Sequence, residues 1–227
     1  MTAIYGSTLG NTVQLVTDGA VTDFDGVLLS TETKVRISNV IPLAVTGRGQ
    51  VEILDVIKNC VVTHSTIYGF DATLAWLQET LRGMRETIEG RGRLGQLDIV
   101  VAGLSGSQGL GLWLIFTHDL YADTPPFNFA PYTITKVPEF AFGPPPSAQA
   151  VDRASGWESD PENLFRRHGA NLLESARSAL ATDWHSDDLK VSIGGHADLT
   201  VVGTDSVTTE RLVTWPDVVG EKMRVAA

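Results

Sequence analysis

Cysteine is nearly absent from this sequence. Its 227 residues contain one cysteine, Cys60. A single thiol cannot close an internal disulfide or supply the several ligands of a cysteine-rich zinc site. Because no base lies beside Cys60 in the sequence, we expect an inert, buried thiol. If the protein has a nucleophile, we therefore expect a hydroxyl group.

Positive charge and long apolar runs are also scarce. The chain has 17 Lys and Arg against 27 Asp and Glu, which gives a formal charge of −10. Binding through nucleic-acid phosphates needs clustered Lys and Arg, so we expect no nucleic-acid partner. No apolar run approaches the roughly 20 residues that span a bilayer, and no signal peptide opens the chain. We therefore expect a soluble, cytoplasmic protein with no membrane partner.

The composition does support a sizeable core. Hydrophobic residues make up 43% of the chain and charged residues 19%. At this length one domain is the default, so we predict a single domain over residues 1–227.

The order of predicted elements indicates an α+β fold. The first fifty residues alternate short β-rich runs with tight turns, and apolar residues at helical spacing begin at Val51. A second helix is predicted from its N-cap Asp71 to its stop at Gly90. The remaining predictions are a strand pair over residues 97–104 and 112–117, a proline-rich loop over 121–147 with short strands near 132–137 and 140–142, a helix over 161–180 and closing strands over 191–193, 197–202 and 211–214. This order fits two stacked, largely antiparallel sheets with outer helices, or a simpler α+β sandwich.

Several familiar catalytic and binding motifs are missing from the sequence. There is no G-x-S-x-G around Ser105 or Ser107, and no phosphate-binding G-x-x-x-x-G-K-[ST]. The five histidines include no pair at helical spacing for zinc. His196 and Asp198 can share one strand face, where we expect a solvated pair at a strand end. We expect no metal and no cofactor.

The most specific chemical pattern begins at Thr2. Removal of Met1, which a small second residue favours, would leave Thr2 with a free α-amine. A threonine hydroxyl needs a base to take its proton, and an α-amine with a pKa of about 7.7–8.0 can act as that base near neutral pH. A nearby lysine would help keep the amine neutral, and an aspartate would hold the lysine. Asp18 and Lys34 supply both in the β-rich start of the chain.

These residues together resemble a known family. Thr2, Asp18-Gly19, Lys34-Val35-Arg36 and the glycine turn Thr46-Gly47-Arg48-Gly49 resemble the proteasome β-subunit family of N-terminal nucleophile (Ntn) hydrolases. The resemblance is greatest to the threonine peptidase subunit of the bacterial ATP-dependent protease. Residues 97–103 and 111–115 resemble the central strand pair of that family, and residues 194–199 resemble its closing strand. The resemblance covers most of residues 2–203.

The resemblance implies a fold and a set of roles. The fold would be a four-layer αββα sandwich of two antiparallel sheets flanked by helices. Thr2 would be the nucleophile that cleaves peptide bonds through an ester. The supporting roles would be Asp18 and Lys34 as tuning residues, the Gly47 N–H as oxyanion donor, and Asp183 and Ser186 as supports of the α-amine.

The resemblance also implies partners. They would be a peptide or unfolded-protein substrate, further copies of the chain in a ring or stacked homo-oligomer, and an ATP-dependent unfoldase.

One segment departs from the family. In place of a Gly-Ser-Gly turn the chain has Phe142-Gly143-Pro144-Pro145-Pro146-Ser147, whose prolines cannot donate backbone hydrogen bonds. We expect Ser147 to be a turn residue. This departure keeps open the alternative of a non-catalytic scaffold subunit. A small-molecule amidohydrolase that acts as a dimer is a further alternative. Arg48, beside the glycine turn, is expected to be exposed.

Overall fold

The chain forms two compact units. The computed structural model describes residues 2–123, 125, 128–154, 160–178, 181–183, 186–191 and 193–224, with backbone only for residues 181–183 and 186–190. The first unit consists of Met1–Lys34, Glu139–Val201 and Thr208–Ala227, and the second of Val35–Pro138 and Val202–Val207. The single domain predicted over residues 1–227 stays a prediction.

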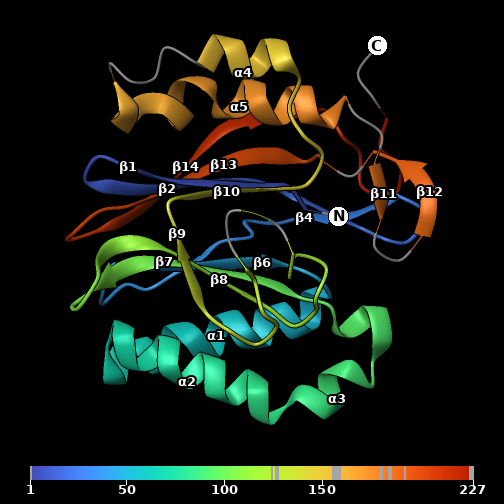
Figure 1. Cartoon of the computed structure of the whole chain (residues 1–227). Helices are drawn as coiled ribbons and strands as arrows, with labels where there is room; N and C mark the ends of the chain where they lie inside the picture. Colours follow the sequence, from blue (N-terminus) through green and yellow to red (C-terminus); the bar gives the residue numbers. More distant parts are fainter. Residues whose placement is uncertain are drawn as a thin grey trace. The chain divides into compact units, whose positions relative to one another are not determined.

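A five-stranded sheet forms the centre of the first unit. Its strand order is β10-β1-β2-β13-β14 (Figure 1). The strands are β1 (Ile4–Leu9), β2 (Thr12–Asp18), β10 (Glu139–Phe142), β13 (His196–Val202) and β14 (Val207–Thr214). β1 pairs antiparallel with both β2 and β10, and Gly10 at a φ of 57° makes the tight β1–β2 turn. This hairpin is the first of the β-rich runs joined by tight turns that the sequence predicts.

Two helices cover one face of this sheet. α4 (Ala148–Ala154) and α5 (Leu164–Arg177) lie along it, and the 3₁₀ turn η3 (Pro161–Asn163) precedes α5 (Figure 1). Phe165, Leu172 and Leu173 of α5 pack with Tyr5 and Val16 of the sheet in one buried apolar cluster. Burial of this apolar face stabilises the helix on the sheet.

The first unit also contains short antiparallel ribbons. In its described part, β3 (Ala20–Thr22) pairs with β4 (Leu28–Thr31), and β11 (Ala181–Asp183) pairs with β12 (Ser186–Lys190). The β3–β4 ribbon follows directly after Asp18. It therefore leads the chain from Asp18 to Lys34.

The second unit is built on another five-stranded sheet. Its order is β5-β6-β7-β8-β9, and every neighbouring pair is antiparallel. The strands are β5 (Arg36–Ile37), β6 (Leu43–Arg48), β7 (Asp98–Ser105), β8 (Gly109–Phe116) and β9 (Thr135–Val137). The predicted strand pair of residues 97–104 and 112–117 is the β7–β8 hairpin.

Helices cover one face of this second sheet. They are α1 (Val51–Tyr68), α2 (Phe70–Gly83), α3 (Arg85–Glu89) and the 3₁₀ turn η1 (Gly92–Gly95) (Figure 1). Leu54 and Val61 of α1 and Leu74, Leu77 and Leu81 of α2 share one buried cluster with the sheet. Their spacing is the helical repeat seen in the sequence.

Three details of these helices correct the sequence predictions. The second helix ends at Gly83 and does not reach Gly90, and Met84 separates it from α3. Glycine lowers helix stability, so a break beside Gly83 has a local cause. Asp71 lies in the first turn of α2, and Gly69 occupies the cap position. Cys60 is exposed on α1.

In the described part of the chain, no helix combines the length and the apolar character that a membrane span requires.

Candidate active site

One lysine joins Thr2 to Asp18 in the first unit. Thr2 precedes β1, Asp18 ends β2, and Lys34 lies just after β4. Lys34 Nζ donates a hydrogen bond to Thr2 Oγ1 at 2.9 Å and another to Asp18 Oδ1 at 2.9 Å. The structure thus brings together the three residues that the sequence predicts as nucleophile and tuning pair.

The Asp18 carboxylate is buried and well supplied with donors. Its side chain is 0% exposed, and that of Lys34 is 10% exposed. Among the described residues, the Asp18 carboxylate also accepts hydrogen bonds from the backbone N–H groups of Ala3 at 2.9 Å, Ala20 at 3.1 Å and Gly194 at 3.4 Å. A buried carboxylate is stable only with such partners. They fix the carboxylate, and the carboxylate fixes the ammonium group.

The β1–β2 hairpin explains why Thr2 lies beside Asp18. Its register pairs Ile4 with Thr17, so Ala3 comes opposite Asp18. The Asp18 N–H donates to the Ala3 carbonyl at 3.3 Å. Thr2 and Asp18 therefore lie at the same open end of one hairpin. The position of the turn in the sequence sets this register, and the register places Thr2 next to Asp18.

The proline-rich loop packs against the start of β1. Gly143 has a φ of 109°, and a Cβ there would come within 3.0 Å of Ala3 Cα. The Tyr5 hydroxyl donates to the Pro144 carbonyl at 2.8 Å. Burial first, and then the charge of Asp18, raise the pKa of Tyr5, so its hydroxyl stays protonated as the donor. At Pro144, which has no N–H, the loop is thus held to β1 through its carbonyl group.

Ser147 ends this loop at the start of α4. The Ala150 N–H donates to Ser147 Oγ at 3.2 Å, as at the N-terminus of a capped helix. The Ser147 N–H donates to Ser175 Oγ at 3.1 Å. Ser147 is thus engaged in local structure, in line with its prediction as a turn residue.

The other predicted site residues belong to other strands. Gly47 lies in β6 of the second unit, opposite Ile99, and a Cβ there would collide with the Asp98 carbonyl. Asp183 and Ser186 face each other in the β11–β12 register, and their side chains lie outside the described part of the chain. The roles predicted for Gly47, Asp183 and Ser186 stay predictions.

A polar cluster beside the site, whose His196 and Asp198 are buried, was not predicted. We call Thr33, His196, Asp198 and Arg211 the Asp198 cluster. Asp198 accepts hydrogen bonds from Thr33 Oγ1 at 3.0 Å and from Arg211 Nε at 2.9 Å. The side chains of His196 and Asp198 are each 3% exposed, so the expectation of a solvated pair is wrong. The signal available in the sequence was the alternation of His196 and Asp198 on one strand.

His196 packs directly on the residue after Asp18. The Gly19 N–H donates to the His196 carbonyl at 2.8 Å, and a Cβ on Gly19 would overlap the His196 ring. Burial lowers the pKa of His196 and outweighs the opposite effect of Asp198. Arg211 Nη2, which can only donate, lies 2.9 Å from His196 Nε2, and Asp198 Oδ2 lies 3.2 Å from the same nitrogen. A neutral ring with its proton on Nδ1 accepts from the arginine.

The buried neutral histidine predicts a pH dependence of stability. In the unfolded chain His196 titrates near its ordinary pKa of about 6.5, and in the folded chain at a lower pH. Between these two values the unfolded chain binds more protons, so the free energy of unfolding falls as the pH falls below about 6.5. Thermal unfolding of wild type and His196→Gln between about pH 5 and 7.5 measures this contribution. We expect the variant to lose part of the slope; equal slopes would contradict a neutral buried His196.

Arg48 belongs to a separate buried cluster in the second unit. Its side chain is 6% exposed and contacts Asp98 and the Tyr121 hydroxyl. His118 Nε2 lies 2.8 Å from the other Asp98 carboxylate oxygen. The expectation of an exposed Arg48 is therefore wrong. Its guanidinium group is held by Asp98 inside the fold.

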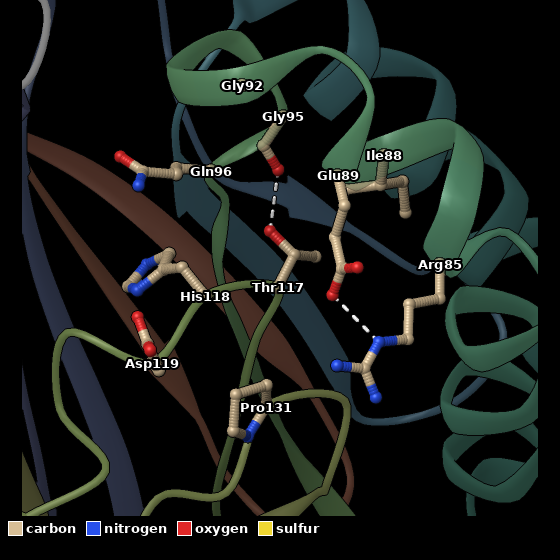
Figure 2. A pocket seen from close by; sticks show the side chains of 10 residues that line it. All are labelled: Arg85, Ile88, Glu89, Gly92, Gly95, Gln96, Thr117, His118, Asp119 and Pro131. Atoms are coloured by element: carbon tan, nitrogen blue, oxygen red, sulfur yellow. Dashed lines mark hydrogen bonds and ion pairs between the residues drawn. The ribbon is translucent and has the colours of Figure 1, made fainter.

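A cavity of about 300 Å³ opens next to this cluster. Figure 2 shows its lining, which includes Arg85, Glu89, Thr117 and His118. Arg85 pairs with Glu89 at 2.7 Å, and Thr117 Oγ1 donates to the Gly95 carbonyl at 2.6 Å. Each of these polar groups has a partner within the fold, so they do not define a ligand site.

Helix-covered antiparallel sheets are the layers of the Ntn hydrolase fold, and comparison with known proteins identifies that fold. No protein-family model and no curated protein matches the sequence. Among solved structures, Anbu (ancestral beta-subunit) from Yersinia bercovieri is similar, with a TM-score of 0.65, over 95% of this chain and 88% of that chain. The sequences are 14% identical, so the likeness concerns the fold alone. The chain has a proteasome-like Ntn fold, which confirms the predicted fold class.

Proposed function

We propose that this chain is a threonine peptidase that hydrolyses peptide bonds through an ester on Thr2, once Met1 has been removed. One observation carries the proposal: Lys34 Nζ lies 2.9 Å from both Thr2 Oγ1 and Asp18 Oδ1. An ammonium group that donates to a hydroxyl oxygen stabilises the negative charge that develops there when the proton leaves. Burial of the pair strengthens this effect.

Acylation uses the Thr2 hydroxyl and its own α-amine. The amine takes the proton from Oγ1, directly or through one water, and Oγ1 attacks the peptide carbonyl carbon. A C–O bond forms and the carbonyl oxygen becomes an oxyanion, for which we propose the Gly47 N–H as donor. The C–N bond then breaks, and the proton on the amine moves to the leaving nitrogen. Thr2 now carries the acyl group as an ester.

Deacylation repeats these steps with water. A water molecule gives one proton to the α-amine and attacks the ester carbonyl carbon. The bond to Oγ1 breaks, and Oγ1 takes the proton back from the amine. The sum is one peptide bond and one water converted to a carboxylic acid and an amine. Asp183 and Ser186 are proposed to hold the α-amine during both halves.

The family resemblance also supports a proposal about assembly. We expect a cytoplasmic homo-oligomer, as a ring or stacked rings, that receives peptides or unfolded protein from an ATP-dependent unfoldase. Native mass measurement tests the assembly. A monomer at working concentration would contradict a chambered protease.

The state of the N-terminus tests the proposed chemistry. A cleavable fusion can release the same chain with either Thr2 or Met1 as its first residue. We expect hydrolysis of fluorogenic peptides only when Thr2 is first, because only then is its amine free. Mass spectrometry verifies both products.

Each other outcome has a defined meaning. Equal hydrolysis by both forms would contradict the role of the amine. Inactivity of both would favour the scaffold alternative, which rests on the Phe142–Ser147 segment. Cleavage of short amides without cleavage of peptides would favour the small-molecule amidohydrolase.

A further inference from the structure

The Asp198 cluster contacts the neighbours of both charged residues in the proposed site. Thr33 immediately precedes Lys34, and its Oγ1 donates to Asp198 Oδ2 at 3.0 Å. His196 packs on Gly19, which immediately follows Asp18. The cluster therefore contacts the residue next to the lysine and the residue next to the aspartate in the sequence.

The hydrogen bond from Thr33 ends on a buried charge. Asp198 is 3% exposed and also accepts from Arg211 Nε at 2.9 Å and Nη2 at 3.3 Å. A hydroxyl that donates to a carboxylate forms a charge-assisted bond, stronger than one between neutral groups. Thr33 itself lies exposed at the surface. Its place is thus fixed by Asp198 rather than by packing.

A second contact fixes the same segment from the other side. The Glu32 N–H donates to the Gly19 carbonyl at 2.8 Å. The Gly19 N–H in turn donates to the carbonyls of His196 at 2.8 Å and Gly194 at 3.1 Å. Residues 32 and 33 are therefore tied to the strand that carries Asp18 and to β13. The backbone that leads into Lys34 is therefore held in place by these hydrogen bonds.

From these contacts we infer that Thr33 is a positioning residue, whose hydrogen bond to Asp198 holds the Lys34 ammonium group on Thr2 Oγ1. The inference rests on the proposed function of Thr2. Thr33 does not touch Thr2 and acts through Lys34. Without the anchor, the lysine would spend less time beside the hydroxyl and the α-amine.

The consequence for chemistry is a change in pH dependence. A lysine held near the α-amine lowers the pKa of that amine by like-charge repulsion, so its displacement raises the pKa. The amine acts as a base only when neutral, so the midpoint of the rate profile moves to higher pH. In the described part of the chain, the charged or titratable groups around the lysine anchor include Asp18, Glu32, His196, Asp198, Arg211 and Tyr5.

The test compares labelling of Thr2 in matched variants of the full chain. The probe is a peptide epoxyketone, whose ketone reacts with the hydroxyl and whose epoxide reacts with the free amine. Thr33→Val removes the hydroxyl and keeps the shape, whereas Thr33→Ser keeps the hydroxyl. Thr208→Val, at an exposed threonine of β14, is the matched control. Each form is released with Thr2 first, and labelling is measured over a range of pH.

We expect Thr33→Val to slow labelling about tenfold at neutral pH, the size of one lost charge-assisted hydrogen bond, and to move the midpoint upward. Thr33→Ser should restore both values, and Thr208→Val should match wild type. A Thr33→Val profile with the wild-type midpoint would overturn the inference, even if the rate were lower. If the wild-type protein is not labelled at Thr2, the proposed function itself fails. If the wild-type protein is labelled and Thr33→Val shows the same labelling rate and midpoint, only the inference fails.

Discussion

Replacement of Thr2 by alanine is expected to abolish peptide hydrolysis and covalent labelling. Thr2→Ala keeps the α-amine, Lys34 and Asp18 but lacks the oxygen that attacks the carbonyl carbon. Loss of a nucleophile costs at least about a thousandfold in kcat in comparable hydrolases. Thr2→Ser keeps the hydroxyl and should retain measurable activity. Initial rates on a fluorogenic peptide give the comparison.

A stability measurement accompanies these two variants. Thr2 is half-buried before the first strand, so its truncation should change the free energy of unfolding by no more than about 1 kcal/mol. Undiminished hydrolysis by folded Thr2→Ala would place the activity on another group. That result would remove Thr2 from the mechanism.

Removal of the Lys34 charge is expected to affect both stability and activity. Lys34→Met leaves the Asp18 carboxylate, which is 0% exposed, without its ion pair. The backbone N–H donors remain, so we expect a loss of about 3 kcal/mol in the free energy of unfolding, at the low end for a broken buried pair. Labelling of Thr2 should fall below detection, because no cation remains on Oγ1.

A double variant separates the two effects. Lys34→Met with Asp18→Asn removes the uncompensated charge, so part of the lost stability should return while labelling stays absent. The return is incomplete, because an amide has one acceptor oxygen for backbone N–H groups that use both oxygens of Asp18. Denaturant unfolding and labelling are measured on the same preparations. Wild-type stability in Lys34→Met would mean that the carboxylate is not a buried charge, and labelling of the double variant would remove the lysine from the mechanism.

Local patterns made much of the fold predictable. The Gly10-Asn11 turn defines the β1–β2 hairpin, and Leu74, Leu77 and Leu81 define the buried face of α2. The split at Met84 was missed because apolar residues keep helical spacing across it. The spacing of apolar residues predicts which face of a helix is buried. It does not predict whether the backbone hydrogen bonds continue without a break.

The proximity of Thr2, Asp18 and Lys34 was predictable to the same extent. Thr2, Asp18 and Lys34 come together within one hairpin and the ribbon that follows it, so their spacing in sequence carries the geometry. The bond from Thr33 to Asp198 joins residues 165 positions apart. Likewise Arg48 is buried by Asp98, 50 positions away. Such pairs depend on strand neighbours that no local pattern specifies.

The most direct test of the central claim is mass spectrometry of the epoxyketone adduct. The chain released with Thr2 first is incubated with the peptide epoxyketone, digested and fragmented. We predict one adduct, on the N-terminal peptide, joined through both Thr2 Oγ1 and the Thr2 α-amine. A chain that begins at Thr2 and carries no adduct, or carries it on another residue, would contradict Thr2 as the nucleophile.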